Sequence, residues 1–313
     1  MQWDERIGRR LKLRDLHILM SVAQCGTMGK AAEQLAITQP AVSKAISDIE
    51  HTLKVRLLDR TPRGVEPTLY GRSLLKWGNA VFDDLRQGVR EIEYLSDPTA
   101  GELRIGCTEP MAWGIVPAVI ERLTRQHPRL VFNVTQAEPV TLRDRELRER
   151  NVELVIGRMV TPISDDVQVE ALFEERPFVV AGIRNRWARR RKIDLSELVD
   201  EPWSVGPSDS FAGSLIADAF RAGGLPPPRI SSVTRSIPLH NALLASGRFL
   251  SILPSSLLRF SVDRMLLKIL PVKLPIRPGH VGIAMLKKRT LSPIAQLFIE
   301  CVREVAKPLM NAR

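Results

Sequence analysis

The sequence has few residues of the kinds that build disulfide frameworks, metal centres or membrane anchors. Its three cysteines, Cys25, Cys107 and Cys301, lie far apart and form no C-x-x-C pair, so we expect free thiols. The five histidines are also scattered, without the spacing of metal ligands. The N-terminus lacks the basic and apolar regions of a secretory signal, and no segment is apolar enough to span a bilayer. We therefore expect a cytoplasmic protein with no metal site, no cofactor and no membrane contact.

Sequence motifs of common enzymes are missing as well. The segment Gly206-Pro207-Ser208-Asp209-Ser210 lacks the final glycine of a nucleophile elbow. Gly101 and Gly106 have the glycine spacing of a phosphate loop, but Cys107-Thr108 follows them in place of the Lys-Ser/Thr pair. The second part of the chain has a pattern that predicts a two-lobed α/β domain. Such domains also occur in enzymes, so an enzyme is the main alternative to a binding protein. The missing catalytic motifs favour a protein that is not an enzyme.

What the sequence has in excess is positive charge. The chain carries 46 Lys and Arg against 35 Asp and Glu, a formal net charge of +11, which favours a polyanionic partner. Residues 1–76 hold 13 of the basic and 8 of the acidic residues, so their net charge is +5 and the remaining +6 is spread over the rest of the chain. The densest basic segment runs from Arg184 to Lys192. It is interpreted as a solvated loop, with a secondary contact to DNA as the alternative.

The first seventy residues predict three short helices. An apolar stripe at helical spacing ends at Gly26, a residue suited to a left-handed C-cap. Thr27 can cap a second helix, which carries small residues at 31 and 32, where two helices must approach closely. Thr38 can cap a third helix, and Pro40 falls in its first turn, where a missing N–H has no intrahelical partner. This arrangement predicts a helix-turn-helix unit.

The third helix has one apolar and one polar face. Apolar residues recur at spacings of four, three and four, which predicts a buried stripe: Val42, Ile46, Ile49 and Leu53. The polar face near the N-terminus carries Gln39, Ser43, Lys44 and Ser47. This end of a recognition helix enters the major groove, where Gln pairs with adenine, Lys with guanine or phosphate, and Ser with either. In isolation the same pattern also fits an ordinary amphipathic helix with a solvated face.

A short turn between apolar segments follows the third helix. The sequence Arg60-Thr61-Pro62-Arg63-Gly64-Val65, within residues 55–69, places two arginines in this turn. Such a turn predicts a β-wing whose Arg60 and Arg63 contact phosphates or the minor groove. The wing makes DNA binding the better interpretation of the polar helix face.

A long pattern in this region closely resembles the LysR-type transcriptional regulators. It consists of Ala31-Ala32-(x2)-Leu35-(x2)-Thr38-Gln39-Pro40-Ala41-Val42-Ser43-(x2)-Ile46-(x2)-Ile49-Glu50-(x2)-Leu53, then Leu57-Leu58-(x)-Arg60-(x2)-Arg63-Gly64 and Thr68-(x2)-Gly71. The resemblance implies a winged helix-turn-helix in residues 1–69. It also implies that the operator is faced by Gln39, Pro40, Ser43 and Lys44, with Arg60 and Arg63 near the DNA backbone. The set of expected DNA contacts is completed by Thr27, Lys30, Thr38 and Ser47.

The sequence departs from the family pattern at a few positions. Lys54 stands where the family usually has glycine after the recognition helix, so a left-handed cap there costs roughly 1 kcal/mol. Met28 and Leu58 replace phenylalanines and keep the apolar character. Tyr70 replaces an alanine, which leaves the start of the next helix open.

Residues 70–97 predict a long linker helix. A heptad-like seam with alternating spacings of four and three runs along it: Leu74, Gly78, Val81, Leu85, Gly88, Ile92 and Leu95. The resemblance implies that two chains pair along this helix, and a two-fold protein matches a partly palindromic operator. We therefore expect a homodimer or homotetramer. Because Gly78 and Gly88 each cost about 1 kcal/mol of helix propensity, a shorter helix packed on its own chain is the alternative.

Residues 98–313 predict a separate α/β domain. Strands and helices alternate between 103 and 157, as in a parallel sheet, and do so more weakly between 167 and 270. The resemblance implies a periplasmic-binding-protein-like effector domain with lobe I at about 101–160 and 276–313 and lobe II at about 161–275. We expect hinge crossovers at Arg158–Pro162 and Lys273–Pro278. The predicted fold is multidomain: an N-terminal winged helix-turn-helix, a long linker helix and a C-terminal two-lobed α/β effector domain.

A cleft between two such lobes is the default site for a small ligand. Thr108 follows the first strand, and Ser208 and Ser210 lie in the corresponding loop of lobe II; the resemblance supports all three as effector contacts. Gln136, after the second strand, and Arg158, at the expected hinge, complete the predicted set. For each residue, capping of a helix is the alternative role. Cys107 is a candidate redox sensor, but it has no resolving cysteine nearby, so a buried structural thiol is favoured.

Together these patterns predict a DNA-binding transcriptional regulator controlled by a small molecule. The expected partners are double-stranded promoter DNA, RNA polymerase, further copies of the chain and a small-molecule effector. The effector is expected to be either a sugar or an aromatic or other organic acid. An architectural DNA binder is a third alternative, but such a protein needs no effector domain.

Overall fold

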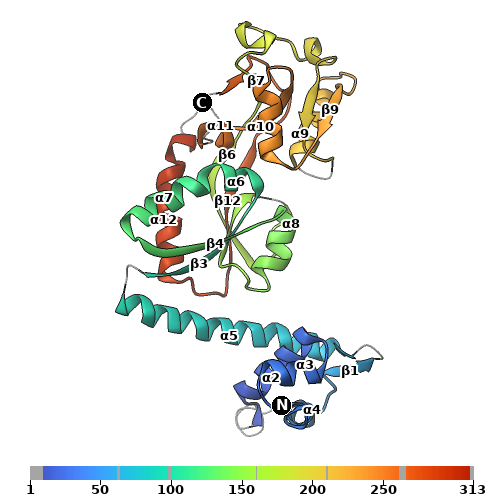
Figure 1. Cartoon of the computed structure of the whole chain (residues 1–313), viewed down its shortest axis with the longest axis vertical. Coiled ribbons are helices and arrows are strands. Elements are labelled where there is room, and N and C mark those ends of the chain that lie inside the picture. The colour runs from blue at the N-terminus through green and yellow to red at the C-terminus, as the bar shows by residue number, and fades with distance from the viewer. Residues whose placement is uncertain are drawn as a thin grey trace. The chain divides into compact units, whose positions relative to one another are not determined.

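The structure, a computed structural model, describes residues 10–61, 64–97, 100–159, 161–208, 211–260 and 266–310, with the backbone alone for Arg60, Phe211 and Ala212. It divides into two compact units, the first ending at Val89 and the second beginning at Arg90. Figure 1 shows the elements of both. Each unit has hydrophobic core clusters of its own.

The first unit contains the three predicted helices, α2 (Leu13–Cys25), α3 (Met28–Gln34) and α4 (Gln39–Leu53). Their apolar stripes face one another and share a core. Among its fully or almost fully buried side chains are Leu19, Val22, Val42 and Ile49. The three-helix prediction is confirmed, because each helix has an apolar stripe of helical period that it can bury only against the other two.

Short-range signals set the ends of these helices. Gly26 ends α2 in the left-handed conformation, with a φ of 73° and its N–H donating to the carbonyl of Val22 at 3.0 Å. Lys54 ends α4 in the same conformation, with a φ of 57°, so the position where the family has glycine is left-handed here as expected. Ala36, in the turn between α3 and α4, also has a positive φ, of 52°. Both non-glycine positions carry backbone strain of roughly 1 kcal/mol.

The predicted wing is an antiparallel pair of strands, β1 (Leu58–Thr61) and β2 (Gly64–Pro67). The N–H of Val65 donates to the carbonyl of Gly26 at 2.8 Å, which docks β2 on the turn between α2 and α3. Gly64 has a φ of 138°, and a Cβ there would lie 2.2 Å from the oxygen of Gly26. Glycine is therefore required at the base of the wing.

The predicted linker helix is α5 (Leu69–Ser96), which is continuous over 28 residues. Gly78 is buried within the first unit: a Cβ there would lie 3.1 Å from Cδ1 of Leu16 and 3.3 Å from Sδ of Met20. Glycine at this position lets α5 approach α2 closely. Later positions of the predicted seam have exposed fractions between 40% and 74%: Val81, Leu85, Ile92 and Leu95. The seam is therefore divided, since its first part packs on its own chain and its second part is exposed.

The second unit contains two lobes, each built on a five-stranded sheet (Figure 1). The sheet of lobe I has the order β4-β3-β5-β12-β6. Its strands are β3 (Ala100–Cys107), β4 (Arg129–Gln136), β5 (Leu154–Arg158), β6 (Val167–Glu175) and β12 (Gly279–Leu286). Helices α7 (Ile115–Gln126) and α12 (Pro293–Met310) pack together against this sheet. Shorter helical segments are α6 (Glu109–Trp113), α8 (Pro139–Thr141) and a π-helical turn (Leu142–Leu147).

The sheet of lobe II has the order β11-β7-β10-β8-β9. Its strands are β7 (Pro177–Gly182), β8 (Trp203–Val205), β9 (Ile230–Val233), β10 (Leu250–Pro254) and β11 (Leu267–Ile269). The helices are α9 (Phe211–Ala222), α10 (Ile237–Ala245) and α11 (Ser255–Phe260), with 3-10 turns at Arg186–Arg189 and Leu195–Leu198. Trp203 and Phe220 meet edge to face in the core, with ring centroids 5.5 Å apart.

Both sheets are mixed, which corrects the expectation of a parallel pattern. β3 runs parallel to β4 and β5, as the βαβ alternation predicts. β12 runs antiparallel to β5 and β6, and β7 runs antiparallel to β10 and β11. The alternation of strands and helices along the sequence predicts the relative direction only of strands that a helix connects. It does not predict that β12, from the end of the chain, inserts between β5 and β6.

The first crossover between the lobes lies at Arg176, and the prediction of Arg158–Pro162 is wrong. β6 stays in the sheet of lobe I because it pairs with β12 along its whole length, and β7 starts the sheet of lobe II at Pro177. Residues 161–175 therefore belong to lobe I. The chain returns to lobe I between β11 and β12, a segment that includes the predicted crossover at 273–278. In addition, α11 packs against α6 and α7 of lobe I.

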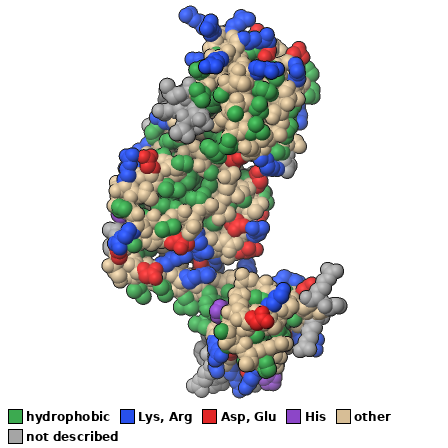
Figure 2. Space-filling view, viewed as in Figure 1, with side chains coloured by type: hydrophobic (Ala, Val, Ile, Leu, Met, Phe, Trp, Pro, Cys, Tyr) green, Lys and Arg blue, Asp and Glu red, His purple; other side chains and the backbone are tan. Residues whose placement is uncertain are grey.

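The basic segment 184–192 lies in lobe II between β7 and β8. Arg186 pairs with the carboxylate of Glu201, and the guanidinium carbons of Arg186 and Arg190 lie 5.3 and 5.7 Å from the ring centroid of Trp187. In the view of Figure 2, Lys and Arg side chains gather over lobe II, at its end away from lobe I. The guanidinium groups lie against Trp187 while both arginines stay exposed, which agrees with the interpretation as a solvated loop.

Helices in the described part of the chain are all too short or too polar to cross a membrane.

Candidate nucleic-acid interface and ligand cavity

The N-terminal turn of α4 is the part of the first unit best suited to read DNA. Thr38 accepts a hydrogen bond from the N–H of Ala41 at 3.4 Å, and Pro40 occupies the first turn, so the helix begins sharply. Its buried face consists of Val42, Ala45, Ile46 and Ile49. Polar side chains on the opposite side are exposed or partly exposed: Gln39, Ser43, Lys44 and Ser47. The predicted division of this helix into two faces is confirmed.

Glu50 connects α4 to the wing. One oxygen of its carboxylate accepts hydrogen bonds from the backbone N–H groups of Leu57 at 2.7 Å and Leu58 at 3.3 Å. These bonds hold the start of β1 against the side of α4. Glu50 belongs to the pattern that resembles the LysR family, but the sequence gives no indication of which N–H groups it accepts from, because those groups lie in the following loop.

The start of α5 fixes the other end of the wing. The hydroxyl of Thr68 donates to the carbonyl of Arg56 at 2.8 Å and accepts from the N–H of Gly71 at 3.0 Å. A Cβ on Gly71 would lie 2.0 Å from the carbonyl oxygen of Leu57, so a larger residue does not fit without movement of the backbone. The recognition helix, the wing and the start of α5 therefore form one hydrogen-bonded frame.

The other predicted DNA contacts lie on α3 and the wing. Thr27 accepts a hydrogen bond from the N–H of Lys30 at 3.2 Å, and the Lys30 side chain is exposed. A Cβ on Gly29 would lie 3.9 Å from Oε1 of Gln39, so the first turns of α3 and α4 are neighbours. Arg60 lies on β1, but its side chain and the whole of Arg63 are outside the described residues.

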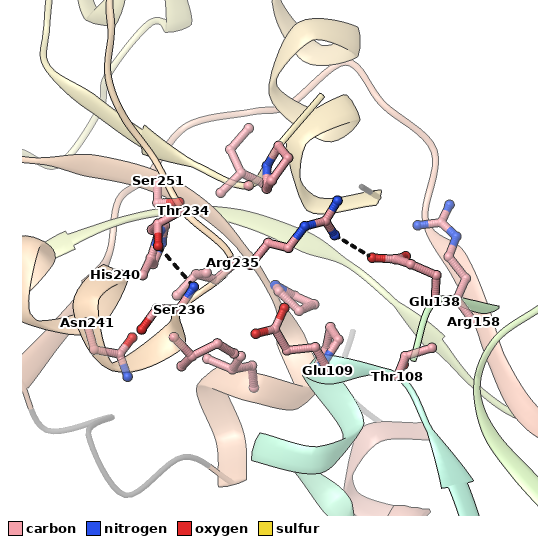
Figure 3. A pocket seen from close by; sticks show the side chains of 18 of the residues that line it. Thr108, Glu109, Glu138, Arg158, Thr234, Arg235, Ser236, His240, Asn241 and Ser251 are labelled. Atoms are coloured by element: carbon pink, nitrogen blue, oxygen red, sulfur yellow. Dashed lines mark hydrogen bonds and ion pairs between the residues drawn. The ribbon is translucent and has the colours of Figure 1, made fainter. Parts of the chain in front are cut away.

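The second unit holds a cavity of about 110 Å³ between its two lobes (Figure 3). Polar lining residues from lobe I are Thr108, Glu109, Glu138, Arg158 and Glu175. Polar lining residues from lobe II are Thr234, Arg235, Ser236, His240, Asn241 and Ser251. Apolar lining residues include Ile237, Ile252, Leu253, Pro254 and Leu257. The cavity thus lies where the carboxyl ends of the parallel strands and the first turns of α6 and α10 meet, as predicted.

An ion pair joins the two lobes at the cavity. Nη1 of Arg235, from the segment between β9 and α10, lies 3.0 Å from Oε1 of Glu138, from the segment between β4 and α8. Figure 3 shows Arg235 reaching from beside Thr234 toward Glu138. Burial raises the pKa of Glu109; the charge of Glu138 raises it further, and Arg235 lowers it. These three side chains form a charged edge of the cavity.

A buried carboxylate lies at the first crossover. Glu175, the last residue of β6, is 4% exposed and accepts a hydrogen bond from the hydroxyl of Ser256 on α11. Burial raises the pKa of Glu175, while the Ser256 hydrogen bond and the charge of Arg158 lower it. Burial also lowers the pKa of the Arg158 guanidinium, and the charge of Glu175 opposes that shift. A Cβ on Gly279 would lie 2.4 Å from Cζ of Arg158, so glycine makes room for the guanidinium.

His240 on α10 is a neutral, buried group in the lining. Its side chain lies 9% exposed, with Nδ1 at 3.1 Å from Oγ of Ser204. Burial lowers the pKa of His240 to about 4, so the ring is uncharged at neutral pH. Nε2 is buried and has no hydrogen-bond partner among the residues that the structure describes. This nitrogen is free to accept or donate one hydrogen bond, which a ligand supplies only if the side chains that cover it shift.

The structure brings two of the five predicted effector contacts into the lining, Thr108 and Arg158. Thr108 is the N-cap residue of α6, yet its side chain makes no capping hydrogen bond, which weakens the alternative role as a cap. Gln136 and Ser208 are exposed and do not line the cavity, and Ser210 is outside the described residues. The predicted loop of lobe II contributes Gly206 and Pro207 instead.

All six polar residues that lobe II contributes to the described lining were missed from the sequence: Thr234, Arg235, Ser236, His240, Asn241 and Ser251. Thr234 to Ser236 precede α10, and Ser236 caps that helix by accepting from the N–H of Leu239 at 3.4 Å. A serine before a helix, directly after a strand, is the signal that identified Thr108, and it was available here too. Glu175 and Ser251 lie inside strands and carry no such signal.

Cys107 lies at the end of β3, beside the cavity, but its side chain is fully buried. Burial raises the pKa of the Cys107 thiol to about 12. Since the thiolate is the reactive form, the thiol is unreactive at neutral pH. The interpretation as a structural thiol is favoured over that of a redox sensor.

Sequence profiles of two families match the chain. Residues 13–72 match the bacterial regulatory helix-turn-helix proteins of the lysR family, and residues 96–307 match the LysR substrate binding domain. The transcriptional regulator GbpR of Azospirillum brasilense is 30% identical over 305 residues, covering 96% of this chain and 89% of GbpR. The transcriptional regulator PcaQ of Agrobacterium fabrum is 25% identical over 308 residues, covering 98% of this chain and 99% of PcaQ.

Solved structures share the fold over almost the whole chain. A full-length single-residue variant of OxyR from Pseudomonas aeruginosa superimposes with a TM-score of 0.68 at 20% identity, covering 97% of this chain and 99% of OxyR. Full-length CbnR in complex with its target DNA superimposes with a TM-score of 0.53 at 21% identity, covering 95% of this chain and 100% of CbnR. The order of a helix-turn-helix, a linker helix and a two-lobed α/β domain is common to this chain and to these regulators.

Proposed function

This chain belongs to the LysR family of bacterial transcriptional regulators, and from that premise we propose how its own residues read promoter DNA and respond to an effector. It is a DNA-binding regulator with a substrate-binding effector domain and not an enzyme. We place its action in the cytoplasm, where promoter DNA and RNA polymerase are found. RNA polymerase is the partner through which a change at the promoter alters transcription.

The recognition step is assigned to the first turns of α4. Gln39, Ser43 and Lys44 present an amide, a hydroxyl and an ammonium group on the exposed side of the helix, where they can contact base edges in the major groove. Thr38, Pro40 and Ser47 flank them, and Thr27 and Lys30 contact the DNA backbone from the first turn of α3. Arg60 and Arg63 of the wing contact phosphates or the minor groove. The observation that carries this proposal is the sharply capped helix with a polar exposed face and a buried apolar one.

Two chains pair through the exposed part of α5. LysR-type regulators form oligomers, and the exposed apolar residues that follow Gly78 supply a surface for a second copy: Val81, Leu85, Val89, Ile92 and Leu95. A dimer presents two copies of α4 to two half-sites of an operator. A homotetramer, made of two such dimers, spans two operators and can bend the DNA between them.

The cavity of the second unit binds the effector. Its lining comes from both lobes, so a ligand that contacts both stabilises one arrangement of the lobes over another. Thr108 and Arg158 from lobe I contact it directly. Gln136 and Ser208, which lie outside the lining, and Ser210, which is outside the described residues, complete the proposed set and contact the effector in a more closed arrangement. The effector controls transcription to the extent that its affinity differs between the two arrangements.

The recognition step is tested by replacing Gln39. An operator is first selected from a random duplex library with the full-length protein. Gln39→Ala should then lower discrimination between operator and random DNA by about 1–3 kcal/mol, measured by fluorescence anisotropy, because an amide pairs with adenine in two hydrogen bonds. Gln24→Ala, an exposed glutamine of α2 outside the proposed interface, is the matched control and should change neither affinity. Equal weakening on both DNAs would make Gln39 a backbone contact.

A further inference from the structure

The charges in the cavity favour some effectors over others. Three carboxylates line it, those of Glu109, Glu138 and Glu175, against two guanidinium groups, those of Arg158 and Arg235. The only histidine in the described lining, His240, is neutral because burial lowers its pKa to about 4. The described lining therefore contains more acidic than basic groups, and its imidazole adds no positive charge at neutral pH.

Each guanidinium of the lining already has a carboxylate beside it. Arg235 lies 3.0 Å from Glu138 across the two lobes. The positive charge of Arg158 is stabilised by Glu175, whose pKa it lowers in return. A carboxylate ligand would have to displace one of these acidic side chains, push Glu109 or Glu175 further toward its protonated form, or add a negative charge beside them. Like charges in a partly buried site oppose each other strongly.

Hydroxyl groups suit the same lining. The buried carboxylate of Glu175 accepts hydrogen bonds from the hydroxyl and the backbone N–H of Ser256, and a carboxylate has room for about four. The buried Nε2 of His240 has no partner among the described residues, and a hydroxyl pairs with either tautomer because it can donate or accept. The first turn of α10 attracts a partly negative oxygen, and a hydroxyl oxygen satisfies this preference without a full charge.

The opposite wall and the size of the cavity restrict the ligand further. Apolar side chains of β10 and α11 line the wall: Ile252, Leu253, Pro254 and Leu257. This wall requires a C–H face. A cavity of about 110 Å³ has room for several water molecules, since one needs roughly 10–15 Å³ by the same measure. A small metabolite therefore fits in the cavity.

We propose that the effector of this regulator is an uncharged molecule with several hydroxyl groups and one C–H face, the chemistry of a monosaccharide or polyol, and that Glu175 is its buried hydrogen-bond acceptor. The proposal rests on the assignment of the cavity as the effector site and decides between the two effector classes that the sequence left open. It assigns Glu175 a role in specificity beyond its place at the crossover.

The ligand class is tested with matched sets of compounds on the full-length protein. Each set contains a sugar, its uronic acid and its amino sugar, for example galactose, galacturonate and galactosamine; pentoses, polyols and benzoate with benzyl alcohol complete the panel. Melting temperature and calorimetry are the measurements, because a ligand of the native state raises the melting temperature. We expect binding by an uncharged polyhydroxylated member, with its acid counterpart at least about tenfold weaker. Tighter binding of an acid or an amine, or no binding by any uncharged sugar or polyol, would overturn the proposal.

The role of Glu175 is tested with a neutral, equally large side chain. Glu175→Gln should weaken the uncharged ligand about 10- to 100-fold, because a hydrogen bond to a charged acceptor is lost. Glu174→Gln removes the same charge one residue away on an exposed side chain, and it should change affinity less than twofold. If the effector were an acid, Glu175→Gln would tighten its binding, since a repelling charge is removed. Unchanged or tighter binding in Glu175→Gln therefore contradicts the assignment.

Two measurements keep the tests separate. The melting temperature of ligand-free Glu175→Gln shows whether this variant folds, and the compound panel on the natural chain decides the ligand class without it. Binding of the ligand-free natural protein to its selected operator tests the proposed regulator function independently of any effector. A protein that binds its operator but responds only to acids keeps the proposed function and loses this inference.

Discussion

The two units differ in how far apart along the chain their candidate functional residues lie. In the first unit, the proposed DNA contacts fall between Thr27 and Arg63, and capping hydrogen bonds that each span three residues position them. In the second unit, the cavity draws on residues from Thr108 to Leu257, at the ends of strands from both lobes. Local backbone geometry therefore controls the first site, and long-range strand pairing controls the second. Substitutions in each unit should show whether its site depends on local backbone geometry or on long-range strand pairing.

The largest effect is expected where local geometry is tightest, at Gly71. A Cβ at this residue would lie 2.0 Å from the oxygen of Leu57, so Gly71→Ala forces the wing away from the start of α5. We expect a loss of more than about 3 kcal/mol in the free energy of unfolding of the first unit and loss of operator binding. Urea unfolding and anisotropy measure the two effects.

Gly88→Ala is the matched control for Gly71→Ala on the same helix. A Cβ at Gly88 meets nothing within 4 Å, so alanine should stabilise α5 by about 0.5–1 kcal/mol through helix propensity. Effector binding should survive in both variants, because the second unit has its own core. Equal stability of Gly71→Ala and the natural chain would show that the frame is not rigid.

A somewhat smaller effect is expected at the exposed part of α5. Leu85 is 49% exposed in the single chain, and Leu85→Glu should weaken the dimer by at least about 2 kcal/mol, because a charge is then buried in an apolar interface. Sedimentation equilibrium measures the dimer, and Glu93→Ala, an exposed residue outside the apolar surface, is the control. A dimer of unchanged affinity in Leu85→Glu would remove α5 from the interface.

The next effect concerns pH and is confined to the second unit. Burial lowers the pKa of His240 from 6.5 to about 4 in the folded state, so the unfolded chain binds a proton first as the pH falls. The free energy of unfolding should therefore decrease by about 2 kcal/mol between pH 7.5 and pH 5 through this residue. His240→Gln should lose that part of the pH dependence in urea unfolding.

The difference between the natural chain and His240→Gln isolates this residue from the neighbouring acids. Glu175 acts in the opposite direction, because its raised pKa favours the folded state at low pH, but this contribution is common to both proteins. His280→Gln, which replaces an exposed histidine on β12, serves as the control and should keep the contribution of His240. An unchanged slope in His240→Gln would mean that its ring titrates alike in both states.

The smallest effect is expected at the ion pair between the lobes. Arg235 and Glu138 have exposed side-chain fractions of 52% and 48%, so solvent screens their attraction. A double-mutant cycle with Arg235→Gln and Glu138→Gln should give a coupling energy below about 1 kcal/mol in the ligand-free protein. A coupling of several kcal/mol would indicate that the pair, and not the packing of α11 on α6 and α7, holds the lobes together.

Most of the first unit was predictable from the sequence, because its signals are short-range. Thr38, Pro40 and the apolar spacing that begins at Val42 define α4 within fifteen residues. The left-handed conformation of Lys54 was predictable because the family usually has glycine at this position. The contacts of Glu50 and Thr68 with the wing were not predictable, since their partners are backbone groups seven to twelve residues away.

The second unit was predictable in its elements and less so in their arrangement. Thr108 was identified because it follows a strand, and Arg158 because of an expected hinge that the structure places elsewhere; both line the cavity. The first crossover was misplaced because β6 follows β5 without a helix, so nothing local indicates that it returns to the same sheet. Glu175 was missed for the same reason: its role depends on the partner strand β12, more than a hundred residues later.

The position of β12 has a consequence for how the protein is made. β12 inserts between β5 and β6, and α12 completes the core of lobe I, so this lobe needs the last residues of the chain. A ribosome that adds roughly 5–20 residues per second takes on the order of ten seconds between β5 and β12. During that time the nascent chain carries a finished DNA-binding unit and two unpaired strand edges. Until β12 is synthesised, these edges are open to pairing with strands of another chain.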